Sequence, residues 1–405
     1  MKIGMLVNNL DTTGGYQKLV LRLTSELTKL GNQVIIYTPS LNKETCYPEI
    51  INQLHIVALK NKSQSKSFLA KIEKYDKLIT TYKQLMLLVD PDLDALIIHD
   101  EYSLLGAALA KMSKKNLAII WMLNNQITST INNYTASIIH HLKQAKGIKA
   151  LIINILSLSG LIKYQKIQHL GLKKINSFAV YDSLNKKLVK KYLNREAIVV
   201  YAGADIESFQ KIRPYRQYHY SNKELRLLSV GVIFPHRRYE DLIEATRLLS
   251  NEQSEIKTII IGKPLAKKYY KELLKQANKD ELGKNIQFIE YLNQKDLLRH
   301  YQEAGIFIFI NDGFTWGISV FEAVAAGLPV IITNNIGAAD IIKNNETGWI
   351  VQPKNPIEVA EAVKDIINNP GKTKKICERA CQEINELLSW KSYTLRMLKL
   401  IKHES

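Results

Sequence analysis

The sequence predicts an α/β protein of two doubly wound domains, each built on a parallel β-sheet. Short apolar runs alternate with longer segments in which apolar residues recur at helical spacing, which is typical of βαβ units. This alternation is interrupted near residues 202–221, a stretch containing Gly203 and Pro214, and then begins again. The chain of 405 residues is also longer than one compact core usually holds. Two independent α/β units account for all three observations.

The first domain contains six candidate strands, each a short apolar run. Between the first two lies Gln17–Leu30, where Leu19, Leu23 and Leu27 stand four residues apart, as on one face of a helix. Strands that alternate with helices in this way favour a parallel sheet. The candidate strands are Lys2–Asn8, Gln33–Thr38, His55–Leu59, Ala95–His99, Leu117–Leu123 and Ser177–Tyr181.

The second domain repeats the same alternation, and a last helix, Ser389–His403, follows it. Ligands of open α/β sheets bind outside the carboxyl ends of the strands, with phosphates at helix N-termini. The loops after the strands are therefore where functional residues are expected. The candidate strands are Leu225–Gly231, Thr258–Ile261, Ile286–Ile289, Ile306–Ile310, Pro329–Thr333 and Gly348–Val351, and the candidate helices are Tyr239–Ser250, Lys268–Lys275, Gln294–Glu303, Ile318–Ala326 and Ala338–Lys343.

The composition is that of a soluble globular protein, with 46% hydrophobic and 23% charged residues. The longest apolar candidate, Ala150–Ile162, is shorter than a membrane span and contains polar residues. The run Met1–Val7 is too short for a signal peptide and is interpreted as a strand. Three cysteines cannot form a disulfide framework, so Cys46, Cys377 and Cys381 are expected to be free thiols in a reducing cytoplasm.

Positive charge is concentrated in the first half of the chain. Residues 1–200 hold 27 lysines and arginines against 13 acidic residues, whereas the remainder holds 29 against 25. Such asymmetry indicates an anionic partner, or else a solvated basic face. Nucleic acid is disfavoured, because neither an aromatic-studded basic sheet nor a recognition-helix motif is present.

One lysine-rich segment, residues 60–88, has apolar residues at helical spacing. This is the pattern of a helix on an anionic bilayer, but equally of a helix packed on the domain core with its lysines in water. Its lysines are Lys60, Lys62, Lys66, Lys71, Lys74, Lys77 and Lys83, its apolar residues are Phe68, Leu69, Ile72, Tyr75, Ile79 and Tyr82, and a second basic cluster comprises Lys163, Lys166, Lys173, Lys174, Lys186, Lys187, Lys190 and Lys191.

The strongest chemical signal is the segment Gly313–Glu322. It follows an apolar strand, forms a loop bracketed by Gly313 and Gly317, and then begins a helix. The unpaired N–H groups of the first turn suit a diphosphate, and Glu322, one turn into the helix, suits ribose hydroxyls. The alternative is an ordinary strand–loop–helix junction with a surface glutamate.

Several segments, taken in order, resemble the family 4 retaining glycosyltransferases of glycosyl transferases group 1. The resemblance implies the GT-B fold: two facing Rossmann-like domains, residues 1–203 and 204–388, with a carboxyl-terminal helix at 389–405 that crosses back to the first. The cleft between the two domains would hold the donor. The matching segments are Gly14–Gly15, Val199–Asp205, Ser229–Arg238, Gly313–Ile331, Gly337–Ile342, Glu346–Val351 and Trp390.

The resemblance assigns roles to individual residues. Arg237 stands where the family binds the donor diphosphate and stabilises the leaving group, a task suited to a permanently charged guanidinium. Glu322 stands at the second glutamate of the family's Glu-x7-Glu pair and would hold the ribose. The backbone of Gly14 and Gly15 would approach donor and acceptor. Thr315, Trp316 and Gly317 would line the sugar, Ile318 and Ser319 would offer N–H groups to phosphate, and Tyr291 would contact the base, unless it packs in the core.

Three departures from the family pattern concern the sugar and the phosphate. Phe314 replaces the first glutamate of the pair, and Asp312 is the nearest carboxylate that could take its place. Val232 replaces an arginine, and Arg238 is the candidate for the second positive charge. Asn124 or Asn125 stands where many members have a histidine near the reacting sugar, and an asparagine cannot titrate. His99 resembles a cleft-facing family position, or is a structural histidine satisfied by a neighbouring carboxylate.

These observations predict an enzyme that transfers a sugar, with retention, from a nucleotide-diphosphate sugar to a hydroxyl acceptor. Arg237 and Asn124 are the expected catalytic residues, and no metal or other cofactor is expected. The acceptor is expected to be a glycan or a lipid-linked molecule, with the protein in the cytoplasm and in peripheral contact with an anionic membrane. The alternative is a non-catalytic GT-B protein that binds nucleotide sugar as a partner subunit, since Phe314 and Asn124 replace residues with chemical roles.

Overall fold

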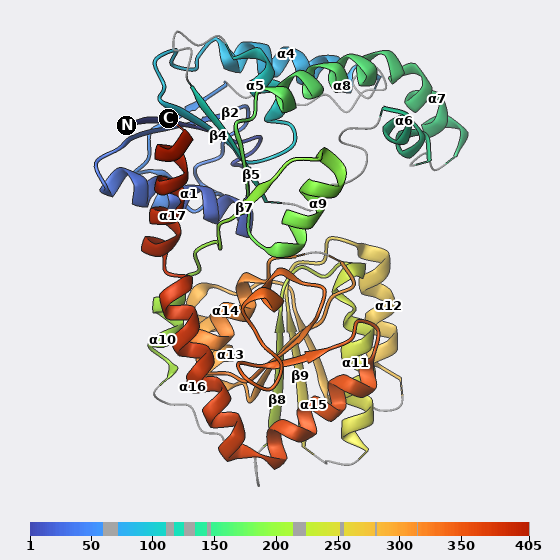
Figure 1. The fold of residues 1–405 in the computed structure, drawn as a ribbon. Coiled ribbons are helices and arrows are strands. Elements are labelled where there is room, and N and C mark those ends of the chain that lie inside the picture. The colour runs from blue at the N-terminus through green and yellow to red at the C-terminus, as the bar shows by residue number, and fades with distance from the viewer. Residues whose placement is uncertain are drawn as a thin grey trace. The chain divides into compact units, whose positions relative to one another are not determined.

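The computed structural model describes residues 1–59, 72–110, 117–124, 134–143, 147–213, 224–251, 255–279, 282–313 and 315–404. The chain forms two compact units (Figure 1). Unit 1 contains Met1–Gly203 and Trp390–Ser405, and unit 2 contains Ala204–Ser389. The chain therefore leaves unit 1 once and returns to it through its last helix.

Unit 1 is a doubly wound sheet in which all neighbouring strands are parallel. The six candidate strands are confirmed, and the sheet gains a seventh at Ala197–Val199, where sequence reasoning saw only the start of an interdomain turn. In spatial order the strands are β3 (Ile56–Ala58), β2 (Gln33–Thr38), β1 (Lys2–Leu6), β4 (Ala95–Ile98), β5 (Ala118–Leu123), β6 (Ser177–Val180) and β7 (Ala197–Val199).

Helices cover this sheet on both faces. Three of them, α4 (Lys74–Met86), α5 (Leu104–Leu109) and α8 (Leu158–Lys173), pack together over one face and share its hydrophobic core. Helix α1 (Gly15–Lys29) packs against α17 (Trp390–Glu404). The remaining helices of the unit are α2 (Pro48–Ile51), α6 (Tyr134–Lys143), α7 (Ile148–Leu156) and α9 (Ser183–Leu193).

Helix α4 shows how the described part of the lysine-rich segment, residues 72–88, packs. Ile79 and Tyr82 are buried in the core of unit 1, and Tyr75 packs on Tyr164 of α8 with ring centroids 5.3 Å apart. The apolar stripe of this helix is therefore covered by protein, and its interpretation as a bilayer-facing stripe is wrong for these residues. Lys60, Lys62, Lys66, Lys71, Phe68 and Leu69 lie outside the described residues.

The return of the chain to unit 1 depends on a glycine. A Cβ atom at Gly203 would lie 2.5 Å from the ring of Trp390, so only glycine allows the indole to approach the backbone here. Further along α17, the Arg396 guanidinium donates to the carbonyl of Tyr201 at 2.8 Å. The turn at residues 199–205 and the last helix, which the sequence treats separately, thus form one contact.

Unit 2 is a second parallel sheet, of six strands. The doubly wound class expected from the sequence is therefore confirmed for both units. In spatial order the strands are β10 (Ile286–Ile289), β9 (Ile256–Ile261), β8 (Leu225–Val230), β11 (Ile306–Phe309), β12 (Val330–Thr333) and β13 (Trp349–Val351), and the helices are α10 (Ile206–Gln210), α11 (Tyr239–Ser250), α12 (Lys267–Ala277), α13 (Gln294–Glu303), α14 (Ile318–Ala325), α15 (Pro356–Asn368) and α16 (Pro370–Leu387).

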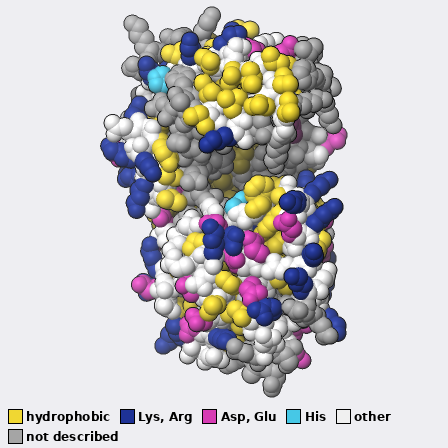
Figure 2. Space-filling view, turned by 90° about the vertical axis from the view of Figure 1, so that its right-hand side faces the viewer, with side chains coloured by type: hydrophobic (Ala, Val, Ile, Leu, Met, Phe, Trp, Pro, Cys, Tyr) yellow, Lys and Arg dark blue, Asp and Glu magenta, His cyan; other side chains and the backbone are white. Residues whose placement is uncertain are grey.

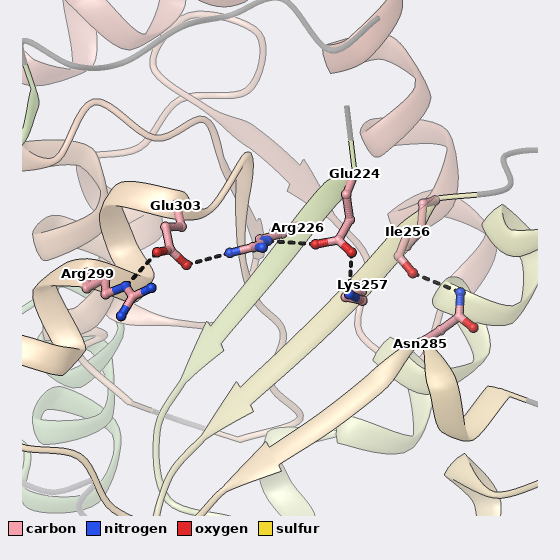
Figure 3. Close-up of polar contacts among 7 residues, drawn as sticks. All are labelled: Glu224, Arg226, Ile256, Lys257, Asn285, Arg299 and Glu303. Carbon is pink, nitrogen blue, oxygen red and sulfur yellow. Dashed lines mark hydrogen bonds and ion pairs between the residues drawn. The ribbon is translucent and has the colours of Figure 1, made fainter. Parts of the chain in front are cut away.

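Ion pairs tie the amino ends of the central strands of unit 2 (Figure 3). Arg226 of β8 binds Glu224 at 2.8 Å and also Glu303 of α13, and Arg299 binds the same Glu303 at 2.7 Å. Lys257 of β9 completes the network on Glu224, whose pKa these hydrogen bonds lower. These ion pairs lie at the amino ends of the strands. The loops at the carboxyl ends of the strands take no part in them.

Candidate functional site

The candidate site of unit 2 lies where its strand order reverses. Strands β8 and β11 are neighbours in the sheet, although β9 and β10 come between them in sequence. Their carboxyl ends are the switch point at which open α/β sheets bind ligands. The loop after β8 brings Arg237 here, and the loop after β11 brings residues 311–317.

Arg237 is buried at this point with its charge unpaired. Arg237 is the last residue of a 3-10 turn, Pro235–Arg237, and is only 3% exposed. No carboxylate in the described ranges forms an ion pair with it. The guanidinium carbon lies 3.5 Å from the Phe309 ring centroid, and Nη2 donates to the carbonyl of Val230 at 3.3 Å. Its Nε has no hydrogen-bond partner among the described residues. A buried cation with unused donors is costly unless an anion binds it.

Glycine at two positions makes room for this guanidinium. A Cβ at Gly231 would lie 2.7 Å from Nη2 of Arg237, and a Cβ at Gly262 would lie 1.9 Å from the carbonyl oxygen of Gly231. The second contact is with backbone, which cannot move aside as a flexible side chain can. Gly231 therefore leaves space for the guanidinium, and Gly262 allows the ends of β8 and β9 to approach closely.

The neighbouring Arg238 differs from Arg237, because carboxylates already neutralise it. Its guanidinium binds Asp241 at 2.8 and 2.9 Å and Glu240 at 2.7 Å. The hydrogen bond to Asp241 raises the pKa of Arg238 further. The structure thus does not present Arg238 as the second phosphate charge that the sequence suggested. Arg237 is the better anion ligand of the two.

The loop after β11 leads into α14 through Gly317, which has a φ of 87°. Only glycine adopts this left-handed conformation without strain. Ser319, in the first turn of α14, donates through Oγ to the carbonyl of Val230 at 3.1 Å. The same carbonyl accepts the bond from Arg237, so the predicted phosphate residues of both loops meet at one atom. The N–H groups of Ile318 and Ser319 begin the helix, as expected.

Glu322 lies one turn further along α14 and is half-buried. Its Oε2 accepts a hydrogen bond from Tyr301 of α13 at 3.4 Å. Tyr301 is fully buried and stacked on Phe307, and burial raises its pKa well above the ordinary value, so it is a permanent donor at neutral pH. Tyr301 therefore orients the carboxylate that the sequence assigned to the ribose.

The residues expected to surround the sugar differ in their exposure and in their contacts. Asp312 donates its N–H to the carbonyl of His236 at 2.7 Å, and its carboxylate pairs with Lys354 at 2.7 Å. Trp316 is 6% exposed and packs on Phe321, so its side chain supports the loop and does not line an open sugar site. Thr315 is half-buried, and its carbonyl accepts from Gly337. Phe314 lies outside the described residues.

Tyr291, after β10, is 82% exposed. The alternative that it packs in the core is therefore wrong. An aromatic ring standing free at the carboxyl edge of the sheet is available to stack on a planar ligand.

A pocket of about 830 Å³ lies beside these loops. It extends from the loop after β8 towards α12, and its lining includes Pro235, His236, Arg238, Glu240 and Asp312. Burial and the neighbouring Arg237 lower the pKa of His236, which favours its neutral form. The pocket adjoins the Arg237–Ser319 centre and does not contain it.

In unit 1 the expected glycines stand at the amino end of α1. Gly14 is the residue before the helix, in extended conformation, and Gly15 is its first residue. Neither has the positive φ that would require glycine. The Gly14 carbonyl accepts a hydrogen bond from Tyr47 at 3.2 Å.

Asn124 is engaged in the framework of unit 1 on both sides of its amide. Its Nδ2 donates to the carbonyl of His99, and its Oδ1 accepts from Tyr181. This side chain therefore joins the ends of β4, β5 and β6, which is a structural task that the catalytic assignment did not include. Asn125, the other candidate, lies outside the described residues.

His99 is 1% exposed, and neither ring nitrogen has a hydrogen-bond partner in the part of the chain that is described. Burial lowers its pKa to about 3. The alternative of a histidine satisfied by a neighbouring carboxylate is wrong, because Asp100 accepts instead from Asn8, Tyr16 and Ser103.

Two further observations concern metals and thiols. Within the described ranges, no group of three or more histidine, cysteine, aspartate or glutamate side chains is placed to hold a metal ion. The three cysteines are buried and free, as expected from their number.

Sequence reasoning missed Phe309, Tyr301 and Lys354. Phe309 and Tyr301 were counted only as apolar members of a strand and a helix, since nothing in a single sequence reveals that a ring faces a guanidinium or a carboxylate. Lys354 pairs with Asp312 from the loop after β13, 42 positions away in the chain. Such partners follow only from the sheet order.

Comparison with known proteins bears on the second unit above all. Residues 213–383 match the family model described as glycosyl transferases group 1. An uncharacterized glycosyltransferase of Haemophilus influenzae is 22% identical over 91% of both chains. An uncharacterized glycosyltransferase of Methanocaldococcus jannaschii is 26% identical over 48% of both chains, and the capsular polysaccharide biosynthesis glycosyltransferase CapM of Staphylococcus aureus is 25% identical over 47% of this chain. The matches span about half the length of these last two relatives, 48% and 52%.

The fold has a solved counterpart across the whole chain. Anabaena HepE, in a complex with UDP and glucose, superposes with a TM-score of 0.72 at 14% identity, covering 100% of both chains. The structural neighbours of this protein are GT-B glycosyltransferases. The chain therefore has the GT-B fold, and its residues 213–383 are similar to the glycosyl transferases group 1 family.

Proposed function

We propose that this protein transfers a sugar from a nucleotide-diphosphate sugar to a hydroxyl acceptor, with retention, as a hexosyltransferase of family 4. Unit 2 binds the donor. The observation that carries the proposal is the unpaired, buried Arg237 at the switch point of the sheet, held by Phe309 and by the carbonyl of Val230. The complex of the similarly folded HepE with UDP and glucose makes UDP-hexoses the first donors to test.

In this proposal the diphosphate lies between the Arg237 guanidinium and the first turn of α14. Arg237 offers Nε and further guanidinium N–H groups, and α14 offers the N–H groups of Ile318 and Ser319. Glu322, oriented by Tyr301, accepts bonds from the ribose hydroxyls. Tyr291 stacks on the base. The sugar would lie near Thr315 and Gly317, the part of the loop next to Phe314, where this chain departs most from its family.

The chemistry needs no titrating group in unit 2. The bond between the anomeric carbon and the diphosphate oxygen breaks, and that oxygen keeps the bonding electron pair and gains a negative charge, which Arg237 and the α14 dipole stabilise. The acceptor hydroxyl forms the new bond on the same face, and its proton passes to the departing diphosphate oxygen. Positive side chains replace the metal that other phosphate-transferring enzymes use, so no cofactor is included.

The acceptor is proposed to be a glycan or a lipid-linked saccharide of the cell envelope, bound by unit 1 in the cytoplasm. The relationship to CapM, a capsular polysaccharide biosynthesis glycosyltransferase, supports this class of acceptor. The excess of lysines in the first half of the chain favours an anionic partner.

A second function, nucleotide-sugar binding without turnover, is favoured by Asn124. Both ends of its amide are engaged in the framework of unit 1, so it offers little to a reacting sugar. A binding protein of this kind would act as a partner subunit.

Hydrolysis of a panel of nucleotide sugars by the purified protein tests the proposal. We expect release of nucleoside diphosphate from at least one donor, and loss of that activity in Arg237→Ala and Glu322→Ala. Full activity in both variants would overturn the site, and tight binding without any turnover, across donors and acceptors, would select the second function.

A further inference from the structure

Helix α7 of unit 1 turns its apolar side outward. Ile148, Leu151, Ile152 and Ile155 follow one another at intervals of three, one and three residues, so they share one face of the helix. They are 80%, 41%, 47% and 50% exposed. Ile139 on α6 and Ile162 on α8, at 46% and 37%, extend the apolar surface on both sides. We call these six residues the α7 patch.

The other side of α7 explains why this orientation is fixed. Asn154 donates through Nδ2 to the carbonyl of His141 on α6 at 2.7 Å. Ser157, at the end of α7, is buried and hydrogen-bonded to the His141 ring at 3.0 Å. Asn154 and Ser157 thus face the protein, whereas Ile148, Leu151, Ile152 and Ile155 are exposed, so the exposed side of the helix is apolar. Figure 2 shows hydrophobic side chains gathered on this face of unit 1, with both basic and acidic side chains near their border.

Lysines predominate in the part of the sequence that contains α7. From Tyr102 to Tyr181 the sequence contains ten lysines and no aspartate, glutamate or arginine. Among them, Lys143 follows the α6 part of the patch and Lys166 stands one turn after Ile162, and both are exposed. Asp76 of α4 lies nearby, but it is paired with Lys163 at 3.2 Å. The α7 patch is therefore an apolar surface whose surroundings are mainly basic.

This combination selects one occupant. A second copy of this chain would bring its own lysines against these lysines, which is unfavourable. An anionic bilayer accepts apolar side chains below its headgroups while the lysines remain among the phosphates. No helix within the described ranges is long and apolar enough to cross a membrane, and α7 has only nine residues. We propose that the α7 patch docks this protein on the surface of an anionic lipid bilayer, with α7 lying in the plane of the interface.

This inference does not depend on the sugar-transfer reaction and places the membrane contact on a different segment from residues 60–88. Its test uses the full-length protein and vesicles that contain no sugar acceptor. We expect co-sedimentation with vesicles of phosphatidylcholine and phosphatidylglycerol, weaker binding to phosphatidylcholine alone, and weaker binding at high salt. Binding to both vesicle types alike, or to neither, would overturn the proposal.

Matched variants distinguish binding through the α7 patch from non-specific hydrophobic binding to vesicles. Ile152→Asn with Ile155→Asn should weaken vesicle binding at least about tenfold, because both side chains would be inserted. The control pair, Leu265→Asn with Ile357→Asn, changes residues of unit 2 that are as exposed, 56% and 59%, and should bind as the unchanged protein does. Since all four positions are exposed, each variant should fold, and circular dichroism checks this.

The charged arm compares Lys143→Gln with Lys166→Gln, in one variant, against Lys268→Gln in unit 2. The first should weaken binding to anionic vesicles and reduce its salt dependence, and the second should do neither. Sedimentation velocity without lipid gives the remaining outcome. A dimer that Ile152→Asn with Ile155→Asn dissociates would show that a second copy covers the patch, which would overturn the proposal.

Discussion

The guanidinium of Arg237 lies over the ring of Phe309, with 3.5 Å between the guanidinium carbon and the ring centroid. Arg237 comes from the loop after β8 and Phe309 is the last residue of β11, and the order of the sheet makes them neighbours. The ring supports the cation without neutralising it, as a carboxylate would. The charge is thus held in place and still available to a ligand.

The first prediction concerns the leaving group. Arg237→Ala should lower the rate of donor cleavage by about 10²–10³-fold, as is usual when one preorganised donor to a developing anion is lost. Arg237→Lys should recover part of that rate, because an ammonium keeps the charge but not the two-pronged geometry. Steady-state kinetics of nucleoside diphosphate release measure both.

Arg238→Ala is the comparison for that experiment. Since Asp241 and Glu240 already bind Arg238, its removal should change the rate by less than about tenfold. An equal loss in both variants would contradict the different roles assigned to the two arginines.

The second prediction concerns the conformation that begins α14. Gly317→Ala should lower the free energy of unfolding by about 1–2 kcal/mol, because alanine is strained at a φ of 87°. The control is Gly371→Ala, near the start of α16, where a Cβ would meet nothing within 4 Å. That variant should be neutral or stabilised by up to about 1 kcal/mol. Urea unfolding of the three proteins gives the comparison.

The third prediction concerns acid stability. Burial lowers the pKa of His99 to about 3, so the folded protein keeps this histidine neutral while the unfolded chain protonates it near its ordinary value of about 6.5. Its contribution to stability is complete above about pH 6.5 and is lost as the pH falls towards 3, by up to about 1.4 kcal/mol per pH unit.

Thermal unfolding between pH 7.5 and 4.5 measures this effect. His99→Phe should unfold with a shallower dependence on pH than the unchanged protein. The exposed His403, replaced by glutamine, should leave the dependence as it was. Parallel curves for the unchanged protein and His99→Phe would contradict the assignment of a buried neutral imidazole.

The fourth prediction concerns the nucleotide base. Because Tyr291 is 82% exposed, Tyr291→Ala should leave the unfolding temperature unchanged. It should weaken donor affinity by about 1–3 kcal/mol if it stacks on a base as aromatic side chains do in nucleic-acid sites. Calorimetric titration with the donor measures the affinity, and an unchanged value would exclude Tyr291 from the site.

Much of the fold could be predicted from the sequence, because buried parallel strands are short apolar runs that stand out from the helices between them. Strand β7 was not predicted, because the apolar run of Ala197–Val199 continues directly into the turn that follows it. Helix α4 shows the limit of pattern reasoning. Its stripe of Tyr75, Ile79 and Tyr82 suits a bilayer and a core equally, and only the packing on α5 and α8 decides between them.

The backbone conformation of the candidate site could be predicted from the sequence, but the contacts of its side chains could be predicted less well. Gly317 and the start of α14 follow from local chain geometry, which nearby residues determine. Arg237 and Arg238 are adjacent and chemically alike, and nothing local distinguishes them. Their difference comes from Phe309, from another strand, and from Asp241, one turn into α11.

The most direct test of a diphosphate site at Arg237 is a comparison of affinities in two proteins. Calorimetry gives the dissociation constants of UDP and of uridine for the unchanged protein and for Arg237→Ala, with ADP and GDP as further nucleotides. We expect one diphosphate to bind the unchanged protein at least about tenfold more tightly than its nucleoside does, and Arg237→Ala to lose most of this difference. An equal gain from the diphosphate in both proteins, or no gain for any of the three nucleotides, would contradict this expectation.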